Sequence, residues 1–149
     1  MSQTPEAVVR AWFDEVWNKR DESAIERLMD PQAVAHGLGP ETRRGPAGFK
    51  TIHQTFTRAF GNIHIDVERT VTEGDTCVAL CHVTGTHGGH SLGAPPSNKD
   101  VDYWGMTMVR VKNGRIVEGW NAFDFLTMYQ QMGWVGTPVL PAGSTAAIP

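Results

Sequence analysis

Asp124 is the strongest candidate for chemistry in the sequence, because its carboxylate is set among the aromatic residues Trp120, Phe123 and Phe125. A carboxylate in apolar surroundings is costly unless it is paired or protonated, and desolvation raises its pKa. An aspartate with a raised pKa can take a proton from the carbon next to a carbonyl group. The competing interpretation is structural, since an aspartate at this point would also cap the helix that follows it.

Proton abstraction next to a carbonyl group also needs hydrogen-bond donors at the oxygen that gains charge. His36, in a short predicted strand, and His53, on the apolar face of a predicted helix, are expected to act with Asp124 in catalysis. We expect His82 and Asn121 to contact the substrate. For each histidine, a packed side chain with a structural hydrogen bond is the alternative.

Aromatic residues and methionines are plentiful for a chain of this size, which suits an apolar pocket with a few polar groups. The remaining residues that we expect to contact a ligand are Phe13, Trp17, Phe56, Trp104, Met108, Arg110 and Trp120. Trp104, Met108 and Arg110 share one face of a predicted strand. If that face points inward, Arg110 needs an acidic partner, and a pairing with Asp124 would lower the pKa of the aspartate.

The two cysteines and six histidines of the chain do not predict a disulfide or a metal site. Cys77 and Cys81 are four residues apart in one predicted strand, so their side chains lie too far apart to be bonded. Unpaired cysteines favour a reducing compartment, which here would be the cytoplasm. His82 and His87 would face opposite sides of a strand, and no Asp or Cys has the spacing to complete a zinc site with them and His90. We therefore expect no metal.

Hydrophobic periodicity predicts helices first and a sheet afterwards. Helices are expected from Thr4, from Asp21, over residues 46–60 and over residues 124–132. Strands are expected over residues 33–38, 63–71, 76–86 and 101–112 and from residue 115 to Asp124, with a tight turn at Asn113-Gly114. This order predicts an α+β fold in which a curved, mostly antiparallel sheet wraps around a long N-terminal helix and encloses a cone. We expect His53 and Asp124 to point into that cone.

A chain of 149 residues fits a single domain, which we place at residues 1–135. Residues 136–149 are rich in Pro, Gly, Ala, Ser and Thr, and are expected to be flexible or to lie against a partner. The formal net charge is −3 and the basic residues are scattered, which argues against binding of nucleic acid. No window approaches the roughly 20 apolar residues of a membrane span, and we expect no signal peptide.

Several motifs, in order, make the chain resemble the SnoaL-like polyketide cyclase (ester cyclase) family. They are Glu73-Gly74-Asp75 before a strand, Gly85-Thr86-His87-Gly88-Gly89, residues 109–118, Trp120, Asp124 and Gln131-Met132-Gly133. The resemblance implies the cone of the nuclear transport factor 2-like proteins, no cofactor, and oligomers formed through the sheet. It also implies that Asp124 is the acid/base of an intramolecular aldol reaction. The histidine that these cyclases carry on the neighbouring strand is replaced here by Met108 or Arg110.

Three functions are compatible with these observations. The leading hypothesis is a cofactor-independent enzyme that acts on a hydrophobic carbonyl compound by acid/base catalysis, with aldol-type cyclisation or formation or cleavage of a C–C bond. The second is addition of water, as in hydratases and epoxide hydrolases. The third is a non-catalytic protein that binds a small apolar metabolite. We expect a small hydrophobic substrate, and a homodimer or higher homo-oligomer formed through an exposed apolar face of the sheet.

Overall fold

The computed structural model describes residues 3–136, so the predicted C-terminal tail lies almost entirely outside the described residues. The helices in the first half of the chain are α1 (Pro5–Ala11), the π-helix η1 (Trp12–Asn18), α2 (Ser23–Leu28) and α3 (Gly45–Ala59). Two strands, β1 (Met29–His36) and β2 (Arg43–Arg44), lie between α2 and α3. Four long strands follow and a last helix ends the fold: β3 (His64–Glu73), β4 (Thr76–Thr86), β5 (Asp100–Lys112), β6 (Arg115–Phe123) and α4 (Phe125–Gln131). The predicted α+β class is confirmed.

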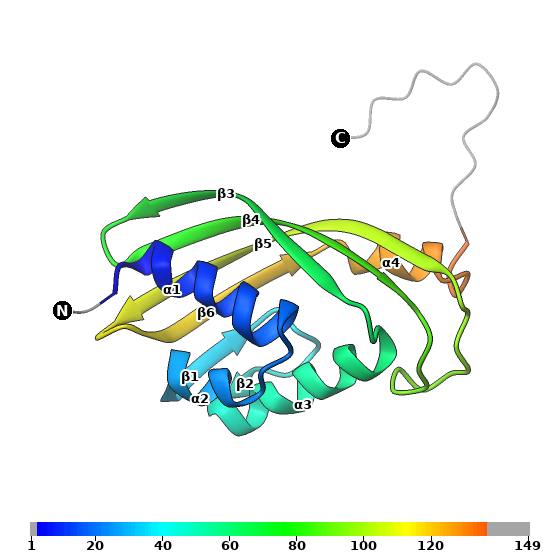
Figure 1. The fold of residues 1–149 in the computed structure, drawn as a ribbon, viewed down its shortest axis with the longest axis horizontal. Helices are drawn as coiled ribbons and strands as arrows, with labels where there is room; N and C mark the ends of the chain where they lie inside the picture. Colours follow the sequence, from blue (N-terminus) through cyan, green and yellow to red (C-terminus); the bar gives the residue numbers. More distant parts are fainter. Residues whose placement is uncertain (1–2, 137–149) are drawn as a thin grey trace, which may run out of the picture.

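The six strands form one sheet in the order β2-β1-β6-β5-β4-β3. Strands β3 to β6 pair antiparallel with their neighbours in sequence, whereas β1 pairs parallel with β6. Figure 1 shows the long strands curving around the continuous helix formed by α1 and η1, with α2 and α3 below it. The predicted arrangement of a curved sheet around an N-terminal helix is therefore confirmed.

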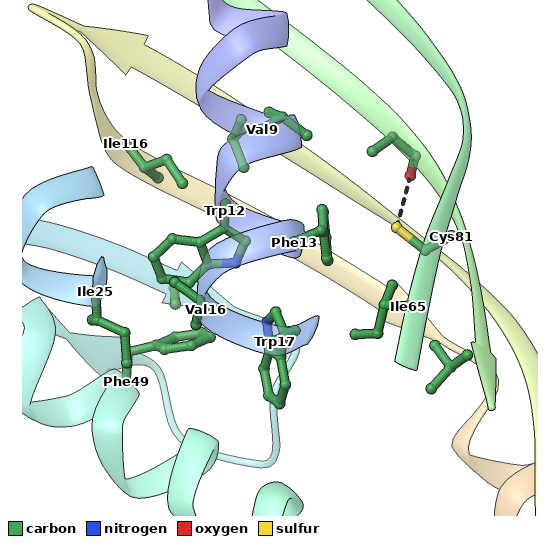
Figure 2. Close-up of a cluster of buried hydrophobic side chains, with 14 of the residues drawn as sticks. Val9, Trp12, Phe13, Val16, Trp17, Ile25, Phe49, Ile65, Cys81 and Ile116 are labelled. Atoms are coloured by element: carbon green, nitrogen blue, oxygen red, sulfur yellow. Dashed lines mark hydrogen bonds between the residues drawn. The ribbon is translucent and has the colours of Figure 1, made fainter. Parts of the chain in front are cut away.

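The N-terminal helix changes its winding halfway, and this change determines which aromatic side chains face inward. Thr4 caps α1 by accepting a hydrogen bond from the backbone N–H of Ala7, as the sequence predicts. In an α-helix, Trp12 and Trp17 would point about 140° apart. The i→i+5 hydrogen bonds of a π-helix bring residues five apart onto one face. Both indoles consequently contact Phe49 of α3, with ring centroids 4.8 and 6.0 Å from it (Figure 2).

The central strand β5 separates the two faces of the sheet. Its residues alternate regularly between buried and exposed, so every second side chain faces the helices. The buried set includes Tyr103 and Thr107, whereas Trp104, Met106 and Met108 on the other face are 46%, 52% and 38% exposed. We call these two sides of the sheet the inner face and the outer face.

Two local predictions are wrong. The first strand, expected over residues 33–38, spans Met29–His36, and it starts earlier because Met29 pairs with Ile116 of β6. The short strand β2 lies just before α3, where no strand is expected from the sequence. Cys77 and Cys81 are buried and free, as expected. No helix within residues 3–136 is long and apolar enough to cross a membrane.

Candidate functional site

An apolar cavity lies between the helices and the inner face of the sheet. Its wall consists of Trp12, Phe13, Trp17, Leu38, Phe49, Ile52, Phe56, Ile63, Ile65, Val83, Tyr103, Asn121, Phe123 and Phe125. Three of these rings, Phe56, Phe123 and Phe125, are only half buried, and Phe125 contacts both of the others, so the cavity opens to solvent on their side. The free space measures about 40 Å³, less than the roughly 150 Å³ that holds a benzene molecule. A larger ligand must therefore displace one or more of the rings that line the cavity.

Asn121 places a polar group in this wall, as the sequence predicts. The Thr107 hydroxyl donates to its Oδ1 at 2.9 Å, and its Nδ2 donates to the His36 carbonyl oxygen at 2.9 Å. Because a carbonyl oxygen can only accept, this contact fixes which end of the amide is the nitrogen. The close approach requires Gly37, where a Cβ would lie 2.0 Å from the backbone oxygen of Asn121. The second Nδ2 hydrogen has no acceptor among residues 3–136.

Apart from Asn121 and the indole N–H groups of Trp12 and Trp17, the polar side-chain group that the described residues place in the wall is the Tyr103 hydroxyl. Tyr103 is 4% exposed, and its hydroxyl makes no hydrogen bond to any of residues 3–136. Burial raises the pKa of this phenol, so it stays neutral and can donate a proton in a hydrogen bond. No carboxylate, imidazole, ammonium or guanidinium group of the described residues lines the cavity.

Asp124 does not face the cavity, and the prediction that its carboxylate lies in apolar surroundings is wrong. The side chain is exposed and caps α4, accepting hydrogen bonds from the Thr127 backbone N–H at 3.0 Å and from the Thr127 hydroxyl at 2.6 Å. These two hydrogen bonds hold the pKa of Asp124 below its usual value, and the bond from the Thr127 hydroxyl has the larger effect. The capping role, which was the alternative interpretation, is confirmed, and the carboxylate is ionised at neutral pH.

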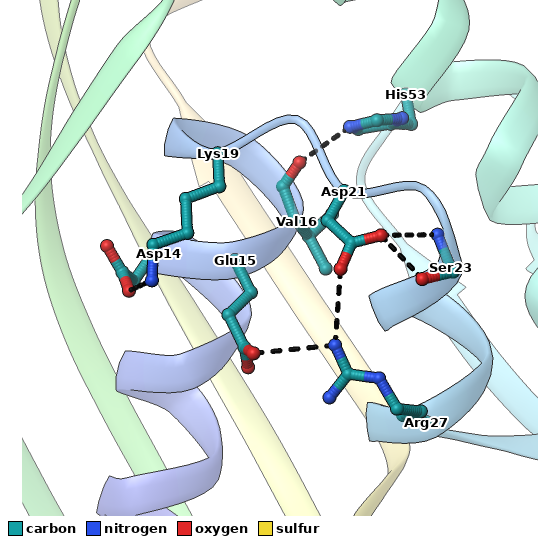
Figure 3. A network of polar contacts seen from close by, with 8 residues as sticks. All are labelled: Asp14, Glu15, Val16, Lys19, Asp21, Ser23, Arg27 and His53. Carbon is teal, nitrogen blue, oxygen red and sulfur yellow. Dashed lines mark hydrogen bonds and ion pairs between the residues drawn. The ribbon is translucent and has the colours of Figure 1, made fainter.

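His53 is buried as predicted but does not line the cavity, so the expectation that it points into the cone is wrong. Its Nε2 donates to the backbone oxygen of Val16 at 2.7 Å (Figure 3), and its ring contacts Trp17 edge-on with centroids 5.1 Å apart. Carbonyl groups at the end of a helix lack partners within the helix. His53 satisfies one of them at the end of η1. Nearby, Arg27 contacts Glu15 and Asp21, which ties α2 to the same turn (Figure 3).

Six further residues predicted for the site lie on the outer face instead: His36, His82, Trp104, Met108, Arg110 and Trp120. The possible Arg110–Asp124 pair is not formed; the Arg110 guanidinium lies 3.6 Å from the Glu118 carboxylate instead. The His36 Nε2 is 2.8 Å from the same carboxylate and is the main cause of the lowered pKa of Glu118. The expectation that this face of β5 points inward is therefore wrong. Asp102 and Arg110, near the two ends of β5, lie on the same face as Trp104, and this face is outside because charged side chains favour contact with water.

Among the described residues, one group has the composition of a metal site. Ligand atoms of Asp66, Glu68 and His82 lie within 4.8 Å of one another on exposed or half-buried side chains. His82 also bonds to Asp102 at 2.6 Å. This group lies on the outer face and does not border the cavity, and the expectation of no metal remains a prediction.

Four of the predicted ligand contacts, Phe13, Trp17, Phe56 and Asn121, do line the cavity. Tyr103 is a further site residue that was not predicted from the sequence. The signal that could have found it is strand parity, because Tyr103 alternates with the charged Asp102 and with Trp104.

The SnoaL-like polyketide cyclase family matches residues 7–132 of the chain. The structure is similar to that of IdmH, a candidate polyketide cyclase from Streptomyces antibioticus, with 28% identity, 88% of this chain and 99% of that chain covered, and a TM-score of 0.77. It is also similar to a candidate SnoaL-like polyketide cyclase from Jannaschia sp. CCS1, with 24% identity, 90% and 93% covered, and a TM-score of 0.80. An LEH-like epoxide hydrolase from M. tuberculosis shares the fold at 16% identity, with 86% and 88% covered and a TM-score of 0.67. No curated protein matches significantly.

Proposed function

Since the chain belongs to the SnoaL-like polyketide cyclase family, we propose that it closes a ring in a hydrophobic carbonyl compound held in the inner cavity, without a cofactor. The proposed reaction is an intramolecular aldol addition. The observation that supports it is the Asn121 amide, which is held on both sides and keeps one N–H without an acceptor among residues 3–136, in a wall without charged side chains of the described residues.

In this reaction, the carbon next to one carbonyl group loses a proton and forms a bond to the carbon of a second carbonyl group, whose oxygen then takes up a proton. The aromatic wall would fold the compound so that the two carbons meet, and such positioning alone can contribute about 7–11 kcal/mol in favourable cases. The free Asn121 N–H would hydrogen-bond the carbonyl oxygen that gains negative charge. One such donor accelerates acyl-transfer enzymes by about 10²–10³.

The proposal differs from the sequence-based hypothesis in its base. Because the described lining residues include no carboxylate or imidazole, we assign the proton transfer to water that enters beside Phe56, Phe123 and Phe125. Asp124 acts as a helix cap. The absence of a carboxylate or imidazole among the described lining residues also favours one other candidate function, which is binding of an apolar carbonyl compound without turnover.

The diketone 1-(2-acetylphenyl)propan-2-one tests this proposal, because its intramolecular aldol reaction followed by loss of water gives the fluorescent 3-methyl-1-naphthol. We expect the protein to accelerate naphthol formation over buffer. Asn121→Leu should lower the rate by about 10²–10³, whereas the control Asp124→Asn should retain it, since asparagine also caps helices well. Binding without acceleration would support the non-catalytic function. A rate that needs Asp124 but not Asn121 would refute the proposal.

We also propose that two copies of the chain pair through the outer face. Trp104, Met106, Met108 and Trp120 expose large apolar side chains on adjacent strands, an arrangement typical of interfaces. Positive and negative groups, such as Arg110 and Glu118, surround them. A twofold pairing would bring like patches together, with opposite charges available at the rim.

A further inference from the structure

The hydroxyl of Tyr103 is a buried polar group without a partner within residues 3–136. A buried tyrosine hydroxyl normally finds a hydrogen-bond partner. In the described part of the chain, the fully enclosed side-chain polar atoms that lack a partner belong to Arg43, His53 and His87. The Tyr103 hydroxyl is not one of them, so it keeps some accessible surface, and Tyr103 is one of the residues that line the cavity. A molecule that enters the cavity could supply the missing partner.

Tyr103 and Asn121 lie at opposite ends of the same wall. Thr107 is the register partner of Asn121, and Tyr103 precedes Thr107 by four residues on the same face of β5. At about 3.3 Å per residue, the two positions are separated by roughly 13 Å along the strand. The ring of Phe123 lies between them over Gly105, its register partner, because a Cβ at Gly105 would be 2.1 Å from the Phe123 ring. The wall thus has a flat apolar centre and a donor at each end.

From this arrangement we infer that the ligand is an elongated, uncharged compound with an apolar body and two oxygen acceptors, one bound by Asn121 and the other by the Tyr103 hydroxyl. The inference rests on the proposed carbonyl contact at Asn121 and adds the second contact, which makes Tyr103 a specificity-determining residue. The phenol stays neutral because burial raises its pKa, so it donates to a carbonyl, ether or hydroxyl oxygen. With no charged side chain of the described residues in the wall, neither end of the ligand has a counter-charge.

Two compounds of nearly equal shape test the inference by fluorescence titration. They are 2,6-diacetylnaphthalene, which has an oxygen at each end, and 2-acetyl-6-isopropylnaphthalene, which lacks the second oxygen. Tyr103→Phe removes only the hydroxyl and should weaken binding of the diacetyl compound about three- to tenfold while leaving the isopropyl compound unchanged. The matched control is Tyr129→Phe, the same change at the other tyrosine of the chain, which does not line the cavity. The Tyr129 phenol adds to the raised pKa of Tyr103, so its removal leaves the Tyr103 hydroxyl neutral and should alter neither affinity.

The outcomes separate this inference from the proposed function. Equal effects of Tyr103→Phe on both compounds, or no effect on either, would overturn the inference. If Asn121→Leu still weakens both compounds in that case, the carbonyl contact of the proposed function stands. If Asn121→Leu weakens neither, the proposed function fails as well. Failure of both compounds to bind the wild-type protein would overturn the two together.

Discussion

Replacing Gly105 by alanine tests whether the Phe123 ring forms the centre of the cavity wall. The added methyl group would lie 2.1 Å from Cδ1 and 2.4 Å from Cγ of that ring. Carbon atoms prefer to be about 3.5–4.0 Å apart, so the ring must move by roughly 1.5 Å. The β5 backbone lies on one side of the ring, and the ring therefore moves toward the cavity. Overpacking costs about 1–3 kcal/mol, of which the stiffer alanine backbone offsets about 0.4–1 kcal/mol.

We therefore expect Gly105→Ala to lower the free energy of unfolding by about 0.5–2.5 kcal/mol, measured by urea denaturation. It should also weaken binding of 2-acetylnaphthalene. Gly119→Ala is the matched control on the same face of the sheet, because its Cβ would lie 3.6 Å from the nearest atom of Val109, an ordinary contact. In a Phe123→Ala background, the cost of Gly105→Ala should disappear. Equal costs at Gly105 and Gly119, or a cost that persists without the Phe123 ring, would refute the reasoning.

Three further predictions concern the cap, the outer face and the thiols. Asp124→Ala should cost about 1 kcal/mol of stability at neutral pH; because folding lowers the pKa of Asp124, this difference should vanish in urea denaturation as the pH falls through the folded pKa. Trp104→Glu should shift the protein from dimer to monomer in sedimentation equilibrium, and an unchanged dimer would place the interface elsewhere. Burial raises the pKa of Cys81 to about 12, so Ellman's reagent should label it only in urea; labelling of the native protein would contradict its burial.

The elements that local chemistry determines were predictable from the sequence. Asn113-Gly114 predicted a hairpin, and both residues have the positive φ angles, 53° and 73°, that a type I′ turn needs. Apolar periodicity located α3 and the four long strands. The start of β1 at Met29 was not predictable in this way, because it depends on parallel pairing with β6, far along the chain. The π-helical conformation of η1 was not predictable either, because no residue type in this segment indicates it.

The site was harder to predict because neighbours in sequence are not neighbours in space. Asp124 follows Phe123, but the chain enters a helix at this point, and the carboxylate turns to the Thr127 N–H while the phenylalanine ring faces the cavity. Both faces of β5 carry apolar side chains, and the large side chain of Trp104 led to the prediction that the face of Trp104 lines the cavity, which is wrong. Only the charged residues near the ends of the strand indicate which face is outside.

The most direct test of the central claim is the infrared spectrum of 2-acetylnaphthalene, ¹³C-labelled at its carbonyl group and bound to the protein. A hydrogen bond from the free Asn121 N–H lowers the carbonyl stretching frequency. We predict a lower frequency in the wild-type complex than in the Asn121→Leu complex, whose carbonyl would lie in an apolar wall. The same frequency in both complexes would contradict the assignment of Asn121 as the group that holds the substrate carbonyl.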